Sequence, residues 1–171
     1  RLLEERGPPM VSLQAIENAK KILAGKVIRT PLVYSPTLTR MTGAQIFLKL
    51  ENLQKTGSFK VRGATYKIIS RLAEIGGAGV VAASAGNHAQ GVALAARQEG
   101  LPATIVMPQW ASLSKQEATR GYGGEVILKG ESISESIAHA LNLSSTGKPF
   151  IHPYDDEDII TGLGTVGLEI L

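Results

Sequence analysis

The fold is decided by residues 80–91, VVAASAGNHAQG. The first four form a continuous apolar run, which is typical of a strand that is covered on both faces. A short polar turn follows, and from Asn87 onward small apolar residues recur at helical spacing. We therefore predict a strand over residues 80–83 and a helix over residues 87–99, which together make one βα unit.

The same alternation continues in both directions along the chain. We predict further strands over residues 45–50, 104–107, 125–128 and 150–152, and further helices over residues 58–75, 113–121 and 132–143. Ser12 is a candidate N-cap for an earlier helix, and a short helix is predicted over residues 36–41. Strands that alternate with helices of this length indicate βαβ units. The predicted fold class is α/β, with open parallel sheets and helices on both faces.

Composition limits the classes of function. The chain has 171 residues, of which 43% are hydrophobic and 19% charged, as in a soluble globular protein. Its net charge of +3 comes from scattered basic residues, and aromatic residues make up only 5%, so we expect no nucleic-acid partner. Cysteine is absent, which excludes disulfides and thiolate metal sites and fits a reducing compartment.

We expect no membrane span and no secretory signal in this sequence. No apolar run approaches the length of a membrane span, and the charged start Arg1–Arg6 does not resemble a secretory signal. We expect a cytoplasmic protein with no membrane partner. The first residue is not Met, so we expect further residues before Arg1.

Lys60 is the first candidate for chemistry. The strand-like run Ile46–Leu50 leads into a polar turn with Gly57, and Ser58 is a candidate N-cap. Lys60 would then lie in a first helical turn, where the positive end of the helix dipole disfavours an ammonium. A lysine with a lowered pKa keeps some free amine and can attack a carbonyl. Lys60 is thus a candidate to hold a carbonyl cofactor as a Schiff base; the alternative is a surface lysine on an ordinary helix.

The loop Ser84–His88 is the second candidate. It follows a strand and opens a helix, the usual ligand position in open α/β sheets, where backbone N–H groups favour a carboxylate or a phosphate. Gly86 brings no Cβ to this approach, and Asn87 offers an amide that can donate to a phenolate or carbonyl oxygen. The alternative is that Ser84 and Asn87 only cap the helix. His88 could act as a general base, but a histidine at a helix start more often forms a local hydrogen bond.

Other motifs point to chemistry less directly. The histidines His88, His139 and His152 lack metal-ligand spacing, so no metal site is predicted. Residues 162–167 match GxGxxG but do not follow a strand, which argues against a dinucleotide site. The acidic run Asp155–Asp158 is explained by the preference of carboxylates for a first helical turn. Residues 76–79, GGAG, are predicted to be a hinge.

Three stretches together resemble the threonine/serine dehydratases, which are fold-type II pyridoxal-phosphate enzymes. They are residues 49–54 with 56–64, residues 84–91, and residues 152–156 with 162–169. Their order and spacing agree with that family, and weaker similarity links them from about Ile28 onward. The resemblance implies that the cofactor is pyridoxal 5'-phosphate, that Lys60 is the Schiff-base lysine, that Phe59 packs against the cofactor ring, and that Asn87 donates to its phenolic oxygen.

The resemblance also implies how substrate is held. Ser84, Ala85, Gly86, Asn87 and His88 would bind the substrate carboxylate, largely through backbone N–H groups. In the related serine racemases, a serine immediately before the Gly-Asn pair serves as a second acid or base. Alanine occupies that position here and cannot transfer a proton, which argues for elimination over racemisation.

The implied activity is the dehydration and deamination of L-threonine, and of L-serine, to a 2-oxo acid and ammonia by a homo-oligomer, either a dimer or a tetramer. The alternatives are a serine racemase or 3-hydroxyaspartate dehydratase of the same fold, or a non-catalytic module that binds a small molecule.

The implied architecture has two domains. Residues 1–69 would begin a large cofactor-binding domain, residues 70–152 would form a small α/β domain, and residues 153–171 would return to the large one. The glycine-rich phosphate loop and the residue facing the pyridine nitrogen would follow Leu171. We therefore expect this chain to be part of a longer protein and to be inactive alone.

Overall fold

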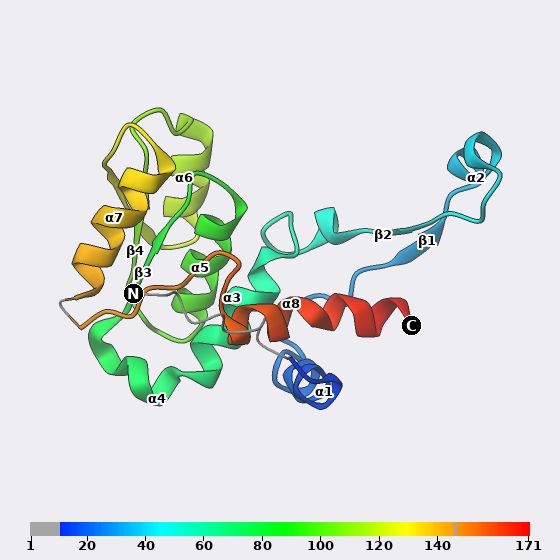
Figure 1. Ribbon diagram of the computed structural model, residues 1–171, viewed down its shortest axis with the longest axis horizontal. Helices are drawn as coiled ribbons and strands as arrows, with labels where there is room; N and C mark the ends of the chain where they lie inside the picture. The colour runs from blue at the N-terminus through cyan, green and yellow to red at the C-terminus, as the bar shows by residue number, and fades with distance from the viewer. Residues whose placement is uncertain (1–10, 146) are drawn as a thin grey trace, which may run out of the picture.

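A three-stranded parallel sheet lies at the centre of the larger body of the protein (Figure 1). The computed structural model describes residues 11–145 and 147–171. The sheet order is β3 (Val80–Ala83), β4 (Ala103–Met107) and β5 (Gly124–Leu128), with Val80 opposite Ala103 and Ala103 opposite Gly124. At the β3 edge, Phe150 adds one parallel bridge to Val81.

Helices flank this sheet and extend beyond it. In chain order they are α1 (Leu13–Ile22), α2 (Pro36–Thr42), α3 (Lys60–Ser70), α4 (Leu72–Ile75), α5 (Asn87–Gln98), α6 (Leu113–Gly121), α7 (Ile133–Ser144) and α8 (Glu157–Ile170), with 3₁₀ turns at Glu51–Leu53 and Gly76–Ala78. The helix starts at Ser12 and Asp156 are capped by those side chains, which accept from Ala15 N–H and Ile159 N–H.

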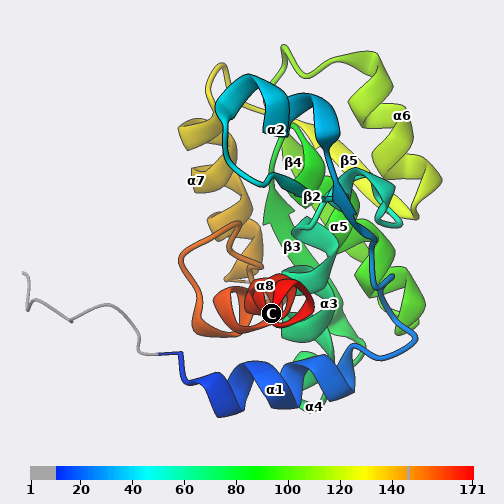
Figure 2. The ribbon, with the colours of Figure 1, turned by 90° about the vertical axis from the view of Figure 1, so that its right-hand side faces the viewer.

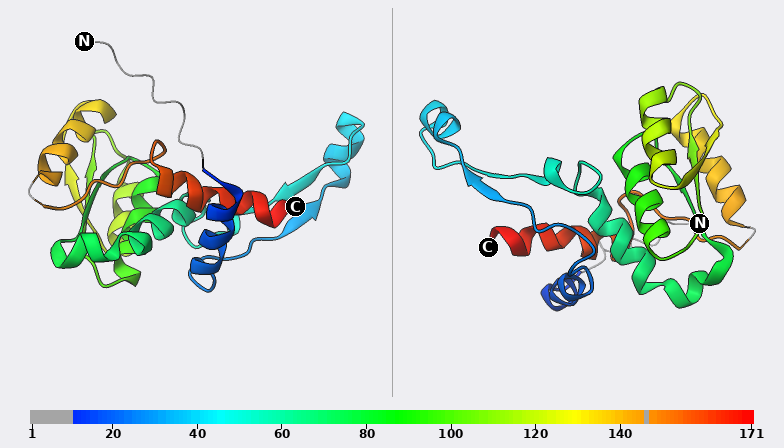
Figure 3. Two further views of the ribbon diagram at one scale, coloured as in Figure 1. Left: turned by 60° about the horizontal axis from the view of Figure 1, so that its bottom comes forward. Right: turned by 180° about the vertical axis from the view of Figure 1, so that it is seen from behind.

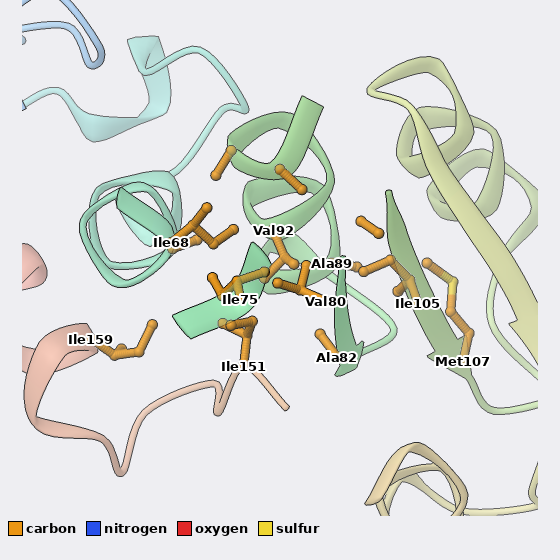
Figure 4. Close-up of a cluster of buried hydrophobic side chains, with 14 of the residues drawn as sticks. Ile68, Ile75, Val80, Ala82, Ala89, Val92, Ile105, Met107, Ile151 and Ile159 are labelled. Carbon is orange, nitrogen blue, oxygen red and sulfur yellow. The ribbon is translucent and has the colours of Figure 1, made fainter. Parts of the chain in front are cut away.

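The core lies on both faces of the sheet because strand side chains alternate. Val80 and Ala82 face the cluster that contains Ala89 and Val92 of α5 (Figure 4). Val81 and Ala83 face the opposite way, into a cluster with α7. Helices α5 and α7 accordingly lie on opposite sides of the sheet (Figure 2). The predicted α/β class, with a parallel sheet covered on both faces, is confirmed.

The predicted strand over residues 45–50 belongs to a different sheet. It is observed as β2 (Phe47–Lys49), which pairs antiparallel with β1 (Leu32–Tyr34), Leu32 lying opposite Lys49. The two strands and α2 form an arm that extends away from the body (Figures 1 and 3). The prediction that this strand belongs to the parallel series was wrong. Its hydrogen-bonding partner is β1, the extended segment that follows Pro31, and not a parallel strand beyond a crossover helix.

The arm exposes an unusual share of apolar surface. Its strand residues Leu32, Val33, Tyr34, Phe47 and Leu48 are between 40% and 53% exposed. The Tyr34 and Phe47 rings contact each other across the pair with centroids 5.4 Å apart. Exposed apolar side chains gathered on one element are typical of a surface that another chain segment or subunit covers.

A predicted helix and a predicted strand have boundaries that differ from those observed. The helix predicted over residues 58–75 begins at Lys60 and bends at Arg71 (φ −111°, ψ 13°), so that α4 can bring Ile75 into the core. Phe59, not Ser58, is the N-cap residue, although Ser58 Oγ accepts from Lys60 N–H at 3.4 Å. The strand predicted over residues 150–152 is reduced to the single bridge at Phe150.

The GxGxxG run lies inside α8, where its glycines allow close helix packing. A Cβ on Gly162 would lie 2.8 Å from the Arg62 carbonyl oxygen and 2.9 Å from Gly63 Cα, both on α3. A Cβ on Gly164 would lie 2.8 Å from Ile16 Cδ1 of α1. The run therefore serves the contact of α8 with α3 and α1, which accounts for the match without a dinucleotide.

Gly162→Ala should lower the free energy of unfolding of the full-length protein by about 1–3 kcal/mol, because backbone atoms of α3 cannot yield to a new methyl group. Gly167→Ala is the matched control in the same helix, since nothing lies within 4 Å of its added Cβ. It should gain about 0.5–1 kcal/mol from helix propensity. Urea denaturation measures both, and equal stabilities for the two variants would disprove the close packing.

Candidate active site

Lys60 begins α3, beside the start of α5. The contact is close because α5 has a glycine there: a Cβ on Gly91 would lie 3.2 Å from the Lys60 carbonyl carbon and from Val61 Cα. The charge of Lys60 also acts on His88, in the first turn of α5. The structure thus packs the predicted lysine against the first two turns of α5, the helix that follows the loop from β3, although the two come from separate parts of the sequence.

The Lys60 amine is partly buried and forms a hydrogen bond to the backbone. Its Nζ donates to the Pro153 carbonyl oxygen at 2.7 Å and lies 5.5 Å from the centroid of the Phe59 ring. Burial lowers the pKa of Lys60 below its ordinary value. The direction is the one that the sequence predicted, and in the structure burial of the amine contributes to it.

His88 is a buried, neutral histidine. Only 4% of it is exposed, and its Nε2 lies 3.0 Å from the Ile151 carbonyl oxygen. Because a carbonyl only accepts, Nε2 carries the proton in this contact. Burial lowers the pKa of His88 to about 4. The histidine therefore stays uncharged at neutral pH, with Nε2 held by backbone 63 residues away rather than by a local partner.

The loop before α5 leaves its helix start open. Ser84 Oγ accepts from Gly86 N–H at 3.1 Å, and no side chain caps α5 at the N-cap residue Gly86. An added Cβ on Gly86 would meet nothing within 4 Å. Lys115 Nζ donates to Asn87 Oδ1 at 3.4 Å, which leaves the Asn87 amide N–H groups to serve as donors.

A buried charge network fixes the elements on which Lys60 is built. The Arg62 side chain, 1% exposed, makes paired hydrogen bonds to Glu51 (2.8 and 2.9 Å) and to Glu169 (2.7 and 2.9 Å). Lys49 Nζ also donates to Glu169, at 2.6 Å. Burial raises the pKa of both carboxyl groups, but the hydrogen bonds and charge of Arg62, together with a further hydrogen bond from Thr30 to Glu51 and from Lys49 to Glu169, hold each pKa below its ordinary value.

Sequence reasoning missed this network and the Pro153 contact. Arg62 gave one signal: it is a charged residue between Val61 and the small residues Gly63 and Ala64, all of which are buried. A charge on a buried helix face requires partners of opposite charge. Nothing in the sequence indicated that the partners would be Glu51 and Glu169.

The residues present fit pyridoxal phosphate. An amine with a lowered pKa suits its aldehyde, and an amide donor suits its phenolic oxygen. The open start of α5 suits an anionic group such as a substrate carboxylate. Thr56, in the turn before Lys60, has a buried hydroxyl with no hydrogen-bond partner in the structure. Among residues 11–145 and 147–171, no three His, Asp or Glu side chains gather as a possible metal site.

The sequence matches the family described as "Pyridoxal-phosphate dependent enzyme" over residues 23–171. The chain belongs to this family. The resemblance seen in the three sequence stretches is thereby confirmed at the level of the family, and the cofactor of this family is pyridoxal phosphate.

The chain is also similar to individual proteins. The chain is 53% identical over 163 residues to the L-threonine ammonia-lyase of Thermotoga maritima, a match that covers 95% of this chain and 41% of that protein. The processed form of threonine deaminase isoform 2 from Solanum lycopersicum superposes with a TM-score of 0.82 at 39% identity, over 96% of this chain and 47% of that one. Maize serine racemase superposes with a TM-score of 0.90 at 40% identity, over 94% and 49%.

The chain therefore spans about two-fifths to half the length of these relatives. Within the described residues, no helix combines the length and the apolar character that a membrane span requires.

Proposed function

We propose that the full-length protein containing this chain dehydrates and deaminates L-threonine, and L-serine, to a 2-oxo acid and ammonia. The observation that carries the proposal is the close packing of the start of α3, with its partly buried Lys60, against α5 at Gly91, one turn beyond the open helix start at Asn87. The 53% identity to an L-threonine ammonia-lyase supports threonine as the substrate.

The site residues take the roles that the resemblance implied. Lys60 would hold pyridoxal phosphate through its amine, with Phe59 against the ring and Asn87 donating to the phenolic oxygen. When bound, this cofactor withdraws electrons from the substrate Cα. Ser84, Ala85, Gly86, Asn87 and His88 would hold the substrate carboxylate, and the uncapped N–H groups of α5 support that role.

Lys60 would also move the proton. Burial lowers the pKa of its amine, which favours the unprotonated form in which Nζ can accept the proton from the substrate Cα. The β-hydroxyl would then leave as water with the proton that Lys60 Nζ took from Cα, and hydrolysis by water would release ammonia and the 2-oxo acid. His88 stays neutral and cannot serve as an acid near neutral pH. Ala85 cannot return a proton from another side, which favours elimination.

The proposal includes two domains. Residues 1–69 and 153–171 would belong to the large domain and residues 70–152 to the small one. The chain would pass between the two domains after residue 69 and again after residue 152. Lys67 of α3, near the first of these points, forms ion pairs with Asp156 (2.8 Å) and Asp158 (3.0 Å) at the start of α8, near the second, which supports this division. We further propose a homo-oligomer in the cytoplasm; the exposed apolar arm and the absence of cysteine support these two points.

The activity is tested by incubating full-length protein, loaded with pyridoxal phosphate, with L-threonine. We expect 2-oxobutanoate and ammonia in equal amounts, and pyruvate from L-serine. Absence of 2-oxobutanoate from protein that carries the cofactor would overturn the proposed reaction.

The second candidate is a serine racemase, favoured by the TM-score of 0.90 to the maize enzyme. Chiral analysis of the L-serine reaction distinguishes the two: the proposal expects pyruvate with little D-serine, and D-serine as the main product would favour the racemase. A non-catalytic binding module would instead yield neither product and would not bind the cofactor covalently.

A further inference from the structure

The hydrogen bond from Lys60 Nζ to the Pro153 carbonyl joins residues that are 93 positions apart. Pro153 lies in the link between the bridge at Phe150 and the start of α8. At 2.7 Å the contact is short for a nitrogen donor, and it engages the one atom on which the proposed function depends. The proposed function as it stands gives this carbonyl no role.

The backbone on the N-terminal side of Pro153 is fixed by the sheet and by α5. Ile151 N–H donates to the Val81 carbonyl of β3 at 2.7 Å. The Ile151 carbonyl accepts from His88 Nε2 at 3.0 Å. Ile151 is fully buried, so this side of the link is anchored to the core.

The backbone on the C-terminal side is fixed by the side chain of His152. Its Nδ1 accepts from the N–H groups of Tyr154 (3.3 Å) and Asp155 (2.8 Å). Asn and Asp side chains form turns of the same kind, because their δ oxygen accepts from N–H groups two and three residues on. The His152 ring also contacts the rings of Phe150 and Tyr154 edge-on, at 6.0 and 4.7 Å between centroids.

We propose that the Pro153 carbonyl is the hydrogen-bond acceptor that holds the Lys60 amine when no cofactor is attached to it, and that His152 positions this carbonyl. The proposal deepens the proposed function and rests on it, because it assumes that Lys60 is the lysine that binds the cofactor. His152 is a positioning residue: it acts on Lys60 through the Pro153 peptide.

The contact has a measurable consequence for the reactivity of Lys60. A carbonyl that accepts from the amine favours its charged form, and so opposes the lowering of the Lys60 pKa by burial. Displacing the carbonyl should therefore lower the pKa of Lys60 further. A change of half to one pH unit corresponds to a change of about three- to tenfold in the ionisation constant.

Substitutions at His152 separate the acceptor from the bulk of the side chain. His152→Asn keeps an acceptor at the δ position, where Oδ1 replaces Nδ1. His152→Gln moves its oxygen one bond further out, and His152→Leu removes the acceptor at similar size. The glutamine variant keeps the site polar, so it serves if the leucine variant fails to fold.

The experiment uses full-length protein from which the cofactor has been removed, and pyridoxal phosphate as the probe. The rate of covalent capture is followed across pH by absorbance, and borohydride trapping with mass spectrometry confirms that Lys60 is the site. In His152→Gln and His152→Leu, the pH midpoint of capture should fall by about half to one unit. In His152→Asn it should stay at the wild-type value.

An unchanged midpoint in the Gln and Leu variants, with normal trapping on Lys60, would overturn the role of His152 and leave the proposed function intact. An equal fall in the Asn variant would also overturn it, because the acceptor would then not be the cause. Failure to trap the probe on Lys60 of the wild-type protein would instead defeat the proposed function, and the role of His152 with it.

Discussion

Lys60→Ala in the full-length protein should remove both the visible absorbance of bound pyridoxal phosphate and the production of 2-oxobutanoate from L-threonine. The variant loses the amine that would hold the cofactor and the atom that would take the Cα proton. Loss of a positioned acid or base alone reduces rates by about 10²–10⁴-fold. Absorbance and turnover, measured on the same preparation, should fall together.

Lys55→Ala is the matched control for this prediction. Lys55 lies in the same turn, is exposed, and donates from Nζ to the Lys26 carbonyl. Its removal should leave absorbance and turnover near the wild-type values. Retained 2-oxobutanoate production in Lys60→Ala would contradict the assignment of Lys60 as the cofactor-binding lysine. Equal losses of absorbance and turnover in both variants would show a general disturbance of the turn.

Arg62→Met should lower the free energy of unfolding by about 3–5 kcal/mol, because it leaves Glu51 and Glu169 buried without their main partner. Methionine keeps much of the length of the side chain, so the effect comes from the charge rather than from a cavity. Urea denaturation at neutral pH measures the difference. The control is Arg71→Met: the Arg71 side chain is 44% exposed, so its loss should cost at most about 1 kcal/mol.

The pH dependence of this difference provides a second check. The pKa values of Glu51 and Glu169 are lowered in the folded state, so the stability they contribute is present above their unfolded pKa. It is lost as pH falls through the folded pKa values. The gap between wild type and Arg62→Met should therefore narrow below about pH 4. A gap that stays constant in acid would show that the carboxylate charges do not cause it.

Strands β3 and β4 of the parallel sheet could be predicted because each is buried on both faces. Val80–Ala83 and residues 104–107 of β4 read as continuous apolar runs, and few structures other than a covered strand produce so short a run. The arm could not be predicted in the same way. An extended segment such as Phe47–Lys49 does not encode its partner, and its pairing with β1 rather than with the central sheet is decided by tertiary contacts.

For the candidate site, local sequence was enough to select residues but not to connect them. Lys60 and the Ser84–Asn87 loop could be chosen because each lies at a helix start, where chemistry and local structure coincide. The acceptor for Lys60 is 93 residues away and the Glu169 partner of Arg62 is 107 residues away. Such pairs follow from the packing of α3 against α8 and against the link that precedes α8, which no local pattern specifies.

The most direct test of the account is to locate the cofactor on the chain. Full-length protein is incubated with pyridoxal phosphate, reduced with borohydride, digested and analysed by mass spectrometry. The account predicts a pyridoxyl group on the peptide that contains Lys60, and on no other lysine in stoichiometric amount. Modification of a different lysine, or none at all in folded protein, would contradict it.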